Sequence, residues 1–126
     1  MIPRGSETVL LVDDVDTILE VGKEILQTLG YDVLVAGSGK EAIEIYENHR
    51  EKIDLIILDI VMPGMGGAET YARLQEINPD IKVLLSSGYS VDGQAIELMK
   101  RGCNGFIRKP FTIEKLSHKI REILDT

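Results

Sequence analysis

The sequence predicts an α/β fold in which a five-stranded parallel sheet is covered by helices on both faces. Three short apolar runs, at residues 9–12, 55–58 and 83–85, lack alternation of polar and apolar positions, which is typical of strands buried on both faces. Segments with helical spacing separate the runs, so strand and helix alternate five times along the chain. This alternation implies right-handed crossovers, and the 126 residues suffice for one domain.

The first half of the chain contains two strand and helix pairs. After the strand at 9–12, a helical stripe precedes Gly30, a suitable C-terminal stop; its members are Ile18, Gly22, Ile25 and Leu29, with Leu26 beside them. A weaker apolar run at 33–36 predicts the next strand. Ser38 is a candidate N-cap for a second helix, whose apolar residues are Ala42, Ile43 and Tyr46.

Three further pairs complete the pattern. Helices are expected at 67–77, 93–101 and 113–124, after strands at 55–58, 83–85 and 105–107. Thr112 is a candidate N-cap for the last helix. The inner side of that helix is expected to carry Ile113, Leu116, Ile120 and Ile123.

Composition excludes several classes of protein. The 14 basic and 21 acidic residues give a net charge of −7, which argues against direct contact with nucleic acid or an anionic membrane. No apolar run approaches the ~20 residues of a membrane span, and a single cysteine, Cys103, favours a reducing, cytoplasmic compartment. Residues 1–6 are interpreted as the remnant of a cleaved purification tag, and residues 7–126 as the domain.

The residues that follow the apolar runs are the candidate site. In open parallel sheets, ligands bind beyond the carboxyl ends of the strands. At that edge the chain places three carboxylates, two hydroxyls and an ammonium group, from Asp13, Asp14, Asp59, Ser86, Ser87 and Lys109. Each residue taken alone also has an ordinary structural interpretation. Asp13 or Asp14 could cap a helix, Asp59 could open a turn, and Lys109 could be a solvated side chain.

Together these residues favour a different interpretation. Three carboxylates at ~4–5 Å repel by roughly 1–4 kcal/mol per pair, so a cation or a proton is needed among them. Hard oxygen ligands suit Mg²⁺, and a neighbouring lysine and hydroxyl suit the oxygens of a phosphoryl group.

At this point the chain resembles the receiver domain of two-component response regulators. The resemblance rests on Asp13-Asp14, on the run from Asp59 to Gly64, on Ser87-Gly88, and on Phe106-Ile-Arg-Lys109-Pro110-Phe111. The resemblance covers residues 7–125. Within this family the chain is most similar to the receivers of hybrid sensor histidine kinases. The resemblance implies a flavodoxin-like (βα)5 three-layer sandwich with strand order 2-1-3-4-5, and a cis bond between Lys109 and Pro110.

The resemblance also implies roles for individual residues. Asp59 is the expected phosphoacceptor, taking a phosphoryl group from a phosphohistidine of a histidine kinase or histidine phosphotransfer domain. Asp14, Asp59 and the backbone carbonyl of Val61 are expected to ligate Mg²⁺ directly, and Asp13 through a bound water. Lys109 would pair with phosphoryl oxygens. Ser87 and Phe106 would carry the switch to the surface around the fourth helix and fifth strand.

Some expectations concern how this chain departs from the family. Gly66 stands where the family often has a capping aspartate. Phe106 stands where a tyrosine is common and has no phenolic hydroxyl. Val61 has no polar group to align water, and Tyr89 is expected to cover the site, so slow autodephosphorylation is predicted.

The resemblance also implies a docking surface: the partner is expected to dock around Val15, Ile18 and Phe111. The domain is expected to be a monomer or weak dimer.

Two other functions fit parts of the sequence. Residues 37–42 form a GxGxxA pattern between a strand and a helix, and Asp59 follows about twenty residues later, as in a small nucleotide-binding α/β domain. That alternative leaves the other strand-end residues unexplained. A phosphatase of the haloacid dehalogenase type would need a second aspartate two residues after Asp59, where Val61 stands.

Overall fold

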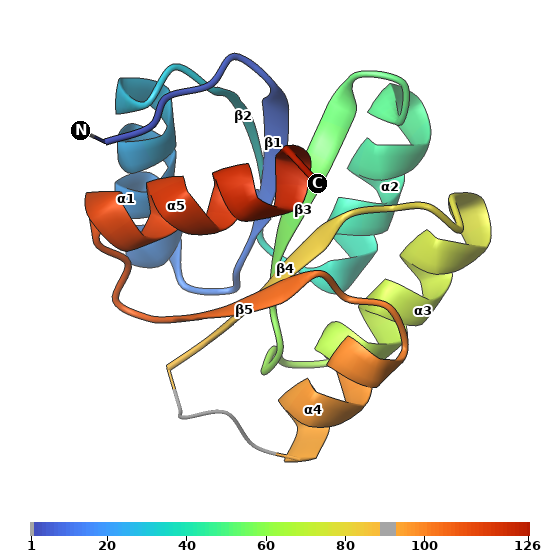
Figure 1. The fold of residues 1–126 in the computed structure, drawn as a ribbon. Coiled ribbons are helices and arrows are strands. Elements are labelled where there is room, and N and C mark those ends of the chain that lie inside the picture. Colours follow the sequence, from blue (N-terminus) through green and yellow to red (C-terminus); the bar gives the residue numbers. More distant parts are fainter. Residues whose placement is uncertain (1, 89–92) are drawn as a thin grey trace.

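A computed structural model describes residues 2–88 and 93–126, and these form a parallel sheet of order β2-β1-β3-β4-β5 (Figure 1). This confirms the flavodoxin-like α/β fold. The elements in chain order are β1 (Thr8–Val12), α1 (Asp16–Thr28), β2 (Asp32–Ala36), α2 (Gly39–His49), β3 (Ile53–Asp59), α3 (Gly67–Ile77), β4 (Val83–Ser87), α4 (Gly93–Lys100), β5 (Gly105–Arg108) and α5 (Ile113–Leu124).

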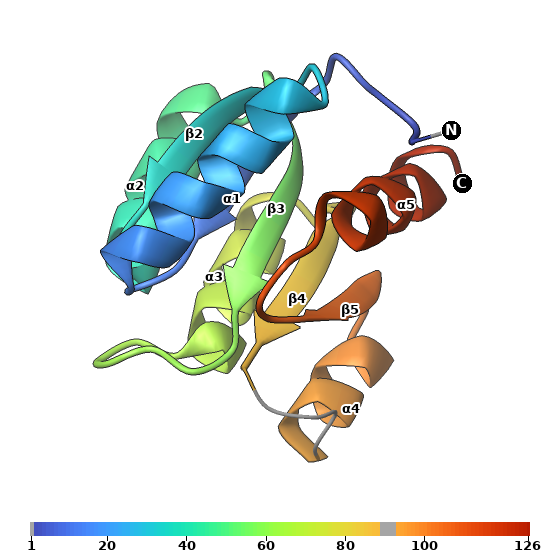
Figure 2. The ribbon, with the colours of Figure 1, turned by 90° about the vertical axis from the view of Figure 1, so that its left-hand side faces the viewer.

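The helices form two layers around the sheet. Helices α1 and α5 cover one face, and α2, α3 and α4 cover the other (Figures 1 and 2). Alternate residues of each strand enter separate cores, so Ile57 and Leu84 pack on the α1/α5 side while Leu58 and Leu85 pack on the other. This two-sided burial explains why the strands appear in the sequence as continuous apolar runs.

The helix ends follow the predicted capping residues. Ser38 Oγ accepts from Glu41 N at 3.1 Å, and Thr112 Oγ1 accepts from Lys115 N at 3.2 Å. Gly30 has φ of +103° and follows α1, where Tyr31 N donates to Leu26 O and so closes the helix in a Schellman motif. Helix α4 ends at Lys100, one residue earlier than predicted.

The GxGxxA pattern has a packing role. Gly39 begins α2 and is buried, and a Cβ there would lie 2.1 Å from Thr70 Oγ1 and 3.2 Å from Met65 O. Glycine at this position therefore lets the start of α2 approach α3 and the loop before it. The pattern serves helix packing, so it does not support the nucleotide-binding alternative.

Ionic contacts join the chain ends at the amino edge of the sheet. Arg121 on α5 forms a bidentate pair with Glu7, with both N–O distances 2.8 Å, and donates to Tyr31 Oη at 3.1 Å. Arg121 also pairs with Asp125 at 2.6 Å, and we call Arg121, Glu7, Tyr31 and Asp125 the Arg121 cluster.

The segment before β1 also contacts the domain, since Gly5 N donates to Leu29 O at 3.1 Å. The tag assignment of residues 1–6 remains a prediction.

The longest helix among the described residues, α1, has 13 residues. Among residues 2–88 and 93–126, no helix combines the length and apolar character that crossing a bilayer requires.

Candidate functional site

The carboxyl edge of the sheet brings together charged residues from three strands. Asp13 directly follows β1, Asp59 is the last residue of β3, and Lys109 directly follows β5. Lys109 N donates to Ser87 O at 2.8 Å, which extends the β4–β5 ladder by one step. Because side chains alternate along a strand, all three residues project on the face that α1 and α5 cover, two positions beyond Leu11, Ile57 and Ile107.

Lys109 lies between two buried carboxylates. Its Nζ is 2.8 Å from Asp13 Oδ2 and 3.4 Å from Asp59 Oδ1. The side chains of Asp13 and Asp59 are only 1% and 4% exposed. Asp13 Oδ1 also accepts from Val15 N at 3.0 Å, and the backbone of Val61 hydrogen-bonds Asp59. The ammonium group is thus shared unequally, with its shorter contact to Asp13.

This unequal sharing leaves Asp59 as the group whose charge is least well compensated. Burial raises the pKa of Asp59 to about 6, and the neighbouring charge of Asp13 acts in the same direction, while Lys109 and the Val61 backbone only partly oppose them. Burial also opposes the charged form of Lys109, but its hydrogen bond to Asp13 and the charges of both carboxylates outweigh burial and raise its pKa.

A third carboxylate completes an acidic cluster that fits a hard cation. One oxygen each from Asp13, Asp14 and Asp59 lie within 4.8 Å of one another. Asp14 is exposed, so the cluster opens to solvent on that side. Three carboxylate oxygens at this spacing, two of them buried and sharing one ammonium, form a donor set of the kind that Mg²⁺ binds together with water.

The other predicted site residues lie around this cluster. Ser87 is buried at the end of β4, and Val61 is 54% exposed in the loop after β3. Phe106 is half-buried on β5 and packs against the core on the α2, α3 and α4 side. The bond between Lys109 and Pro110 is cis, as the resemblance implies. Tyr89 lies outside the described residues.

Several details differ from what the sequence suggested. Neither Asp13 nor Asp14 caps α1, because its N-cap is Val15 and that position makes no side-chain bond. Ser86 and Ser87 form the last two positions of β4 rather than following it. The N-cap of α3 is Gly66, also without a side-chain bond, which confirms that a capping carboxylate is missing there.

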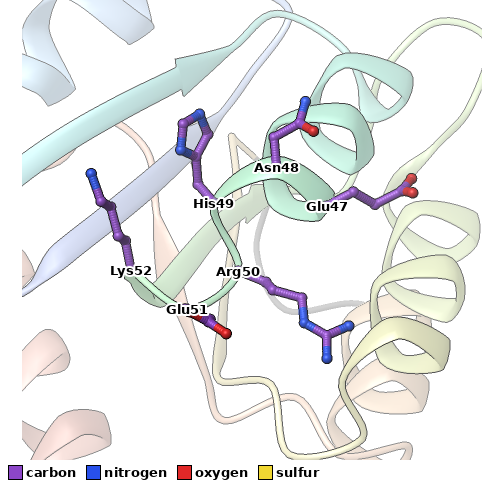
Figure 3. Close-up of a pocket in the computed structure, with 6 residues that line it drawn as sticks. All are labelled: Glu47, Asn48, His49, Arg50, Glu51 and Lys52. Atoms are coloured by element: carbon purple, nitrogen blue, oxygen red, sulfur yellow. The ribbon is translucent and has the colours of Figure 1, made fainter.

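Two hollows lie away from the cluster among the described residues. The larger, of about 770 Å³, runs along β5 and α5 and is lined by residues from Phe106 to Glu122. The smaller, of about 350 Å³, lies at the end of α2 and is lined by residues 47–52 (Figure 3). These residues precede β3, so the hollow is at the opposite end of that strand from Asp59. His49 and His118 are exposed on α2 and α5, and Cys103 is buried with its thiol pKa raised by burial to about 12. Such a thiol stays protonated and unreactive.

Comparisons with known proteins agree with this geometry. Residues 9–121 match the model of the family described as response regulator receiver domain. The chain is 40% identical over 121 residues to the sensor kinase CckA of Brucella abortus, which is 96% of this chain but 13% of that protein. The chain therefore spans a small part of this relative.

Solved structures give the same result. A response regulator receiver domain protein from Clostridium thermocellum superposes with a TM-score of 0.89 at 32% identity, covering 94% of both chains. The response regulator protein TrrA from Thermotoga maritima, crystallised in complex with Mg²⁺-BeF, has a TM-score of 0.83 at 32% identity, covering 94% of this chain and 99% of that one.

Proposed function

The chain belongs to the response regulator receiver domain family, the phosphoacceptors of two-component signalling, and we propose that Asp59 is the residue that accepts the phosphoryl group here. One observation carries the proposal: Asp59 is a buried carboxylate at the end of a central strand, 3.4 Å from a lysine that a second carboxylate holds more closely. The carboxylate is thus near a cation that does not fully neutralise it.

The proposed chemistry needs little from the protein beyond position and charge. A carboxylate oxygen of Asp59 attacks the phosphorus of the donor, the bond from phosphorus to the leaving group breaks, and the leaving group departs with the electron pair. Transfer converts the singly charged carboxylate of Asp59 into a doubly charged aspartyl phosphate beside Asp13, so the site gains one negative charge. Lys109 already lies between these side chains, and an ammonium on a flexible stem reaches the incoming oxygens with a small movement.

We further propose that Mg²⁺ is the cofactor. Asp14, Asp59 and the Val61 carbonyl would hold the ion directly, and Asp13 through a water molecule. The solvated carboxylate of Asp14 and the two buried ones supply hard oxygen donors, and the similar TrrA structure contains Mg²⁺-BeF. The ion would neutralise charge on the phosphoryl oxygens.

For the response to phosphorylation we propose Ser87 and Phe106. Ser87 lies on β4, and its neighbour in register is Arg108 on β5, two positions after Phe106. A hydrogen bond from Ser87 to a phosphoryl group on Asp59 would shift the end of β4. Phe106 packs beside that strand, since its register partner is Leu85. The surface of α4 and β5 would therefore report the change.

A histidine kinase or histidine phosphotransfer domain is the partner class that family membership implies. We propose that the partner docks around Val15, Ile18 and Phe111, because Val15 is 45% exposed at the start of α1 and borders Asp14. The likeness to a sensor kinase makes a cytoplasmic hybrid kinase the proposed parent protein. Chemical-shift mapping with a cognate phosphotransfer domain would test the docking surface, and changes confined to α4 and α5 would contradict it.

The phosphoacceptor assignment is tested by intact mass after incubation with acetyl phosphate and Mg²⁺. The wild type should gain one phosphoryl group, and Asp59→Asn should gain none. Asp54→Asn is a matched control, since Asp54 is on the same strand at the opposite end, where its carboxylate accepts from Thr8 N at 2.9 Å. Incorporation into Asp59→Asn at the wild-type rate would refute the assignment.

A further inference from the structure

A buried hydroxyl beside the site has no hydrogen-bond partner. Ser86 is 1% exposed, and its Oγ is the buried side-chain oxygen or nitrogen that remains unpaired among residues 2–88 and 93–126. A hydroxyl left unsatisfied in a protein interior costs about 1–3 kcal/mol, and alanine would avoid that cost. Such a group therefore calls for an explanation.

The position of Ser86 in the sheet relates it to the phosphoacceptor candidate. Ser86 and Asp59 are direct register partners across β3 and β4, so their side chains project on the same face about 5 Å apart at Cβ. On the other side, the register partner of Ser86 is Ile107 on β5, and Lys109 follows two residues later on the same face. Ser86 is therefore on the same face of the sheet as both Asp59 and Lys109.

Two other buried hydroxyls in the described part of the chain are satisfied. Ser117, which is 0% exposed, donates to Glu114 O at 2.7 Å, and Thr70 donates to Gly66 O at 2.8 Å. Both bonds are local and hold a helical turn. Ser86 lies in a strand whose backbone carbonyl already accepts from Ile60 N at 3.0 Å, so its hydroxyl is not needed for the sheet.

Resting on the proposed function, we propose that Ser86 is a positioning residue for Asp59. Its hydroxyl donates to the carboxylate oxygen that Lys109 releases when the ammonium turns to an incoming phosphoryl group. Asp59 then keeps a donor on one oxygen while the other oxygen attacks phosphorus and the leaving group departs with the bonding electrons. Ser86 keeps its proton throughout, so the step needs no additional acid or base.

The test measures the initial rate of phosphorylation by acetyl phosphate and Mg²⁺, together with thermal unfolding in chelator. Ser86→Ala and the nearly isosteric Ser86→Cys should phosphorylate about ten- to hundredfold more slowly, because a hydrogen bond to a charged group is lost in the step. Ser86→Thr, which keeps the hydroxyl, should stay within about twofold of the wild type. Ser86→Ala should melt at or above the wild-type temperature.

Ser117→Ala is the control, and it should melt lower without a change in rate. Wild-type rates for Ser86→Ala and Ser86→Cys would overturn the inference, and so would a Ser86→Thr variant as slow as Ser86→Ala. A different pattern marks failure of the proposed function itself: either the wild type gains no phosphoryl group, or Asp59→Asn gains as much.

Discussion

Two charged clusters lie at opposite edges of the same sheet and differ in how well their charges are matched. At the amino edge, the Arg121 cluster joins one guanidinium to Glu7 and Asp125 through contacts of 2.6 to 3.2 Å. At the carboxyl edge, the ammonium of Lys109 serves Asp13 and Asp59, at 2.8 and 3.4 Å. Each cluster thus has one cation between two carboxylates.

The pKa values shift in opposite directions. The hydrogen bonds of Arg121 lower the pKa of Glu7 to about 2, against a weaker effect of burial. Burial and Asp13 raise the pKa of Asp59 to about 6. A planar guanidinium satisfies a half-exposed carboxylate through two parallel bonds, whereas one ammonium does not satisfy two buried carboxylates. The amino edge therefore stabilises the fold, and the carboxyl edge retains charge that a ligand can use.

The largest expected effect is from removing the cation at the carboxyl edge. Lys109→Met should lower the free energy of unfolding by about 2–3 kcal/mol at pH 7 in chelator, because two buried carboxylates lose their counterion. The loss should be smaller at pH 5, where Asp59 is protonated. Urea unfolding measures it. Lys119→Met is the control, since its 3.7 Å pair with Glu122 is on the surface of α5, and an equal loss in both variants would contradict this account.

Removing the Asp59 charge should have the opposite sign. The folded-state pKa of about 6 lies above the ordinary value of 3.8, so ionised Asp59 destabilises the fold above pH 6 and the penalty disappears as pH falls below 4. Asp59→Asn should therefore be more stable than the wild type by about 1–3 kcal/mol at pH 7 without metal. Thermal melts between pH 4 and 7 would show the difference shrink. A destabilised Asp59→Asn at pH 7 would identify Asp59 as a structural acceptor.

At the amino edge, neutralising a carboxylate should destabilise the folded protein. Because the folded-state pKa of Glu7 lies below its ordinary value of 4.5, its contribution is complete above that pH and is lost as pH falls toward 2. Glu7→Gln should cost about 0.5–1 kcal/mol at pH 7, a value limited by partial exposure of the pair. Denaturant unfolding at pH 7 and pH 3 tests this. A stabilised Glu7→Gln would remove the contrast between the two edges.

The smallest effect on the metal-free protein is expected from Asp14→Asn. Repulsion among all three carboxylates, as the sequence suggested, would make this variant melt higher, but Asp14 is exposed and the raised pKa of Asp59 has burial and Asp13 as its causes. We expect the free energy of unfolding to change by no more than about 0.5 kcal/mol in chelator.

Mg²⁺ at ten times its dissociation constant should stabilise the wild type by about 1.4 kcal/mol. Asp14→Asn should lose most of that gain, and an undiminished response would place the metal elsewhere.

The fold was predictable because its signals are local. Each strand is a short apolar run, and Ser38, Thr112 and Gly30 act at the helix ends where their residue types are favoured. The grouping of Asp13, Asp59 and Lys109 followed from topology, since the carboxyl ends of parallel strands meet at one edge.

The unpredicted features depend on distances between side chains far apart in the sequence. Glu7 and Arg121 are 114 residues apart, and each is an ordinary polar residue in its local sequence. The preference of Lys109 for Asp13 over Asp59 depends on a difference of 0.6 Å between two contacts of 2.8 and 3.4 Å. The unpaired state of Ser86 is visible only when every neighbouring donor and acceptor has been placed.

The contrast between the two edges is tested most directly by titrating both carboxyl groups in one sample. Side-chain carboxyl carbons, followed by NMR in the metal-free wild type, should show Asp59 titrating near pH 6 and Glu7 near pH 2. Asp59 titrating at or below its ordinary value of 3.8 would mean that Lys109 satisfies it as fully as Arg121 satisfies Glu7. The carboxyl edge would then be a structural ion cluster like the amino edge, and its interpretation as the reactive site would be wrong.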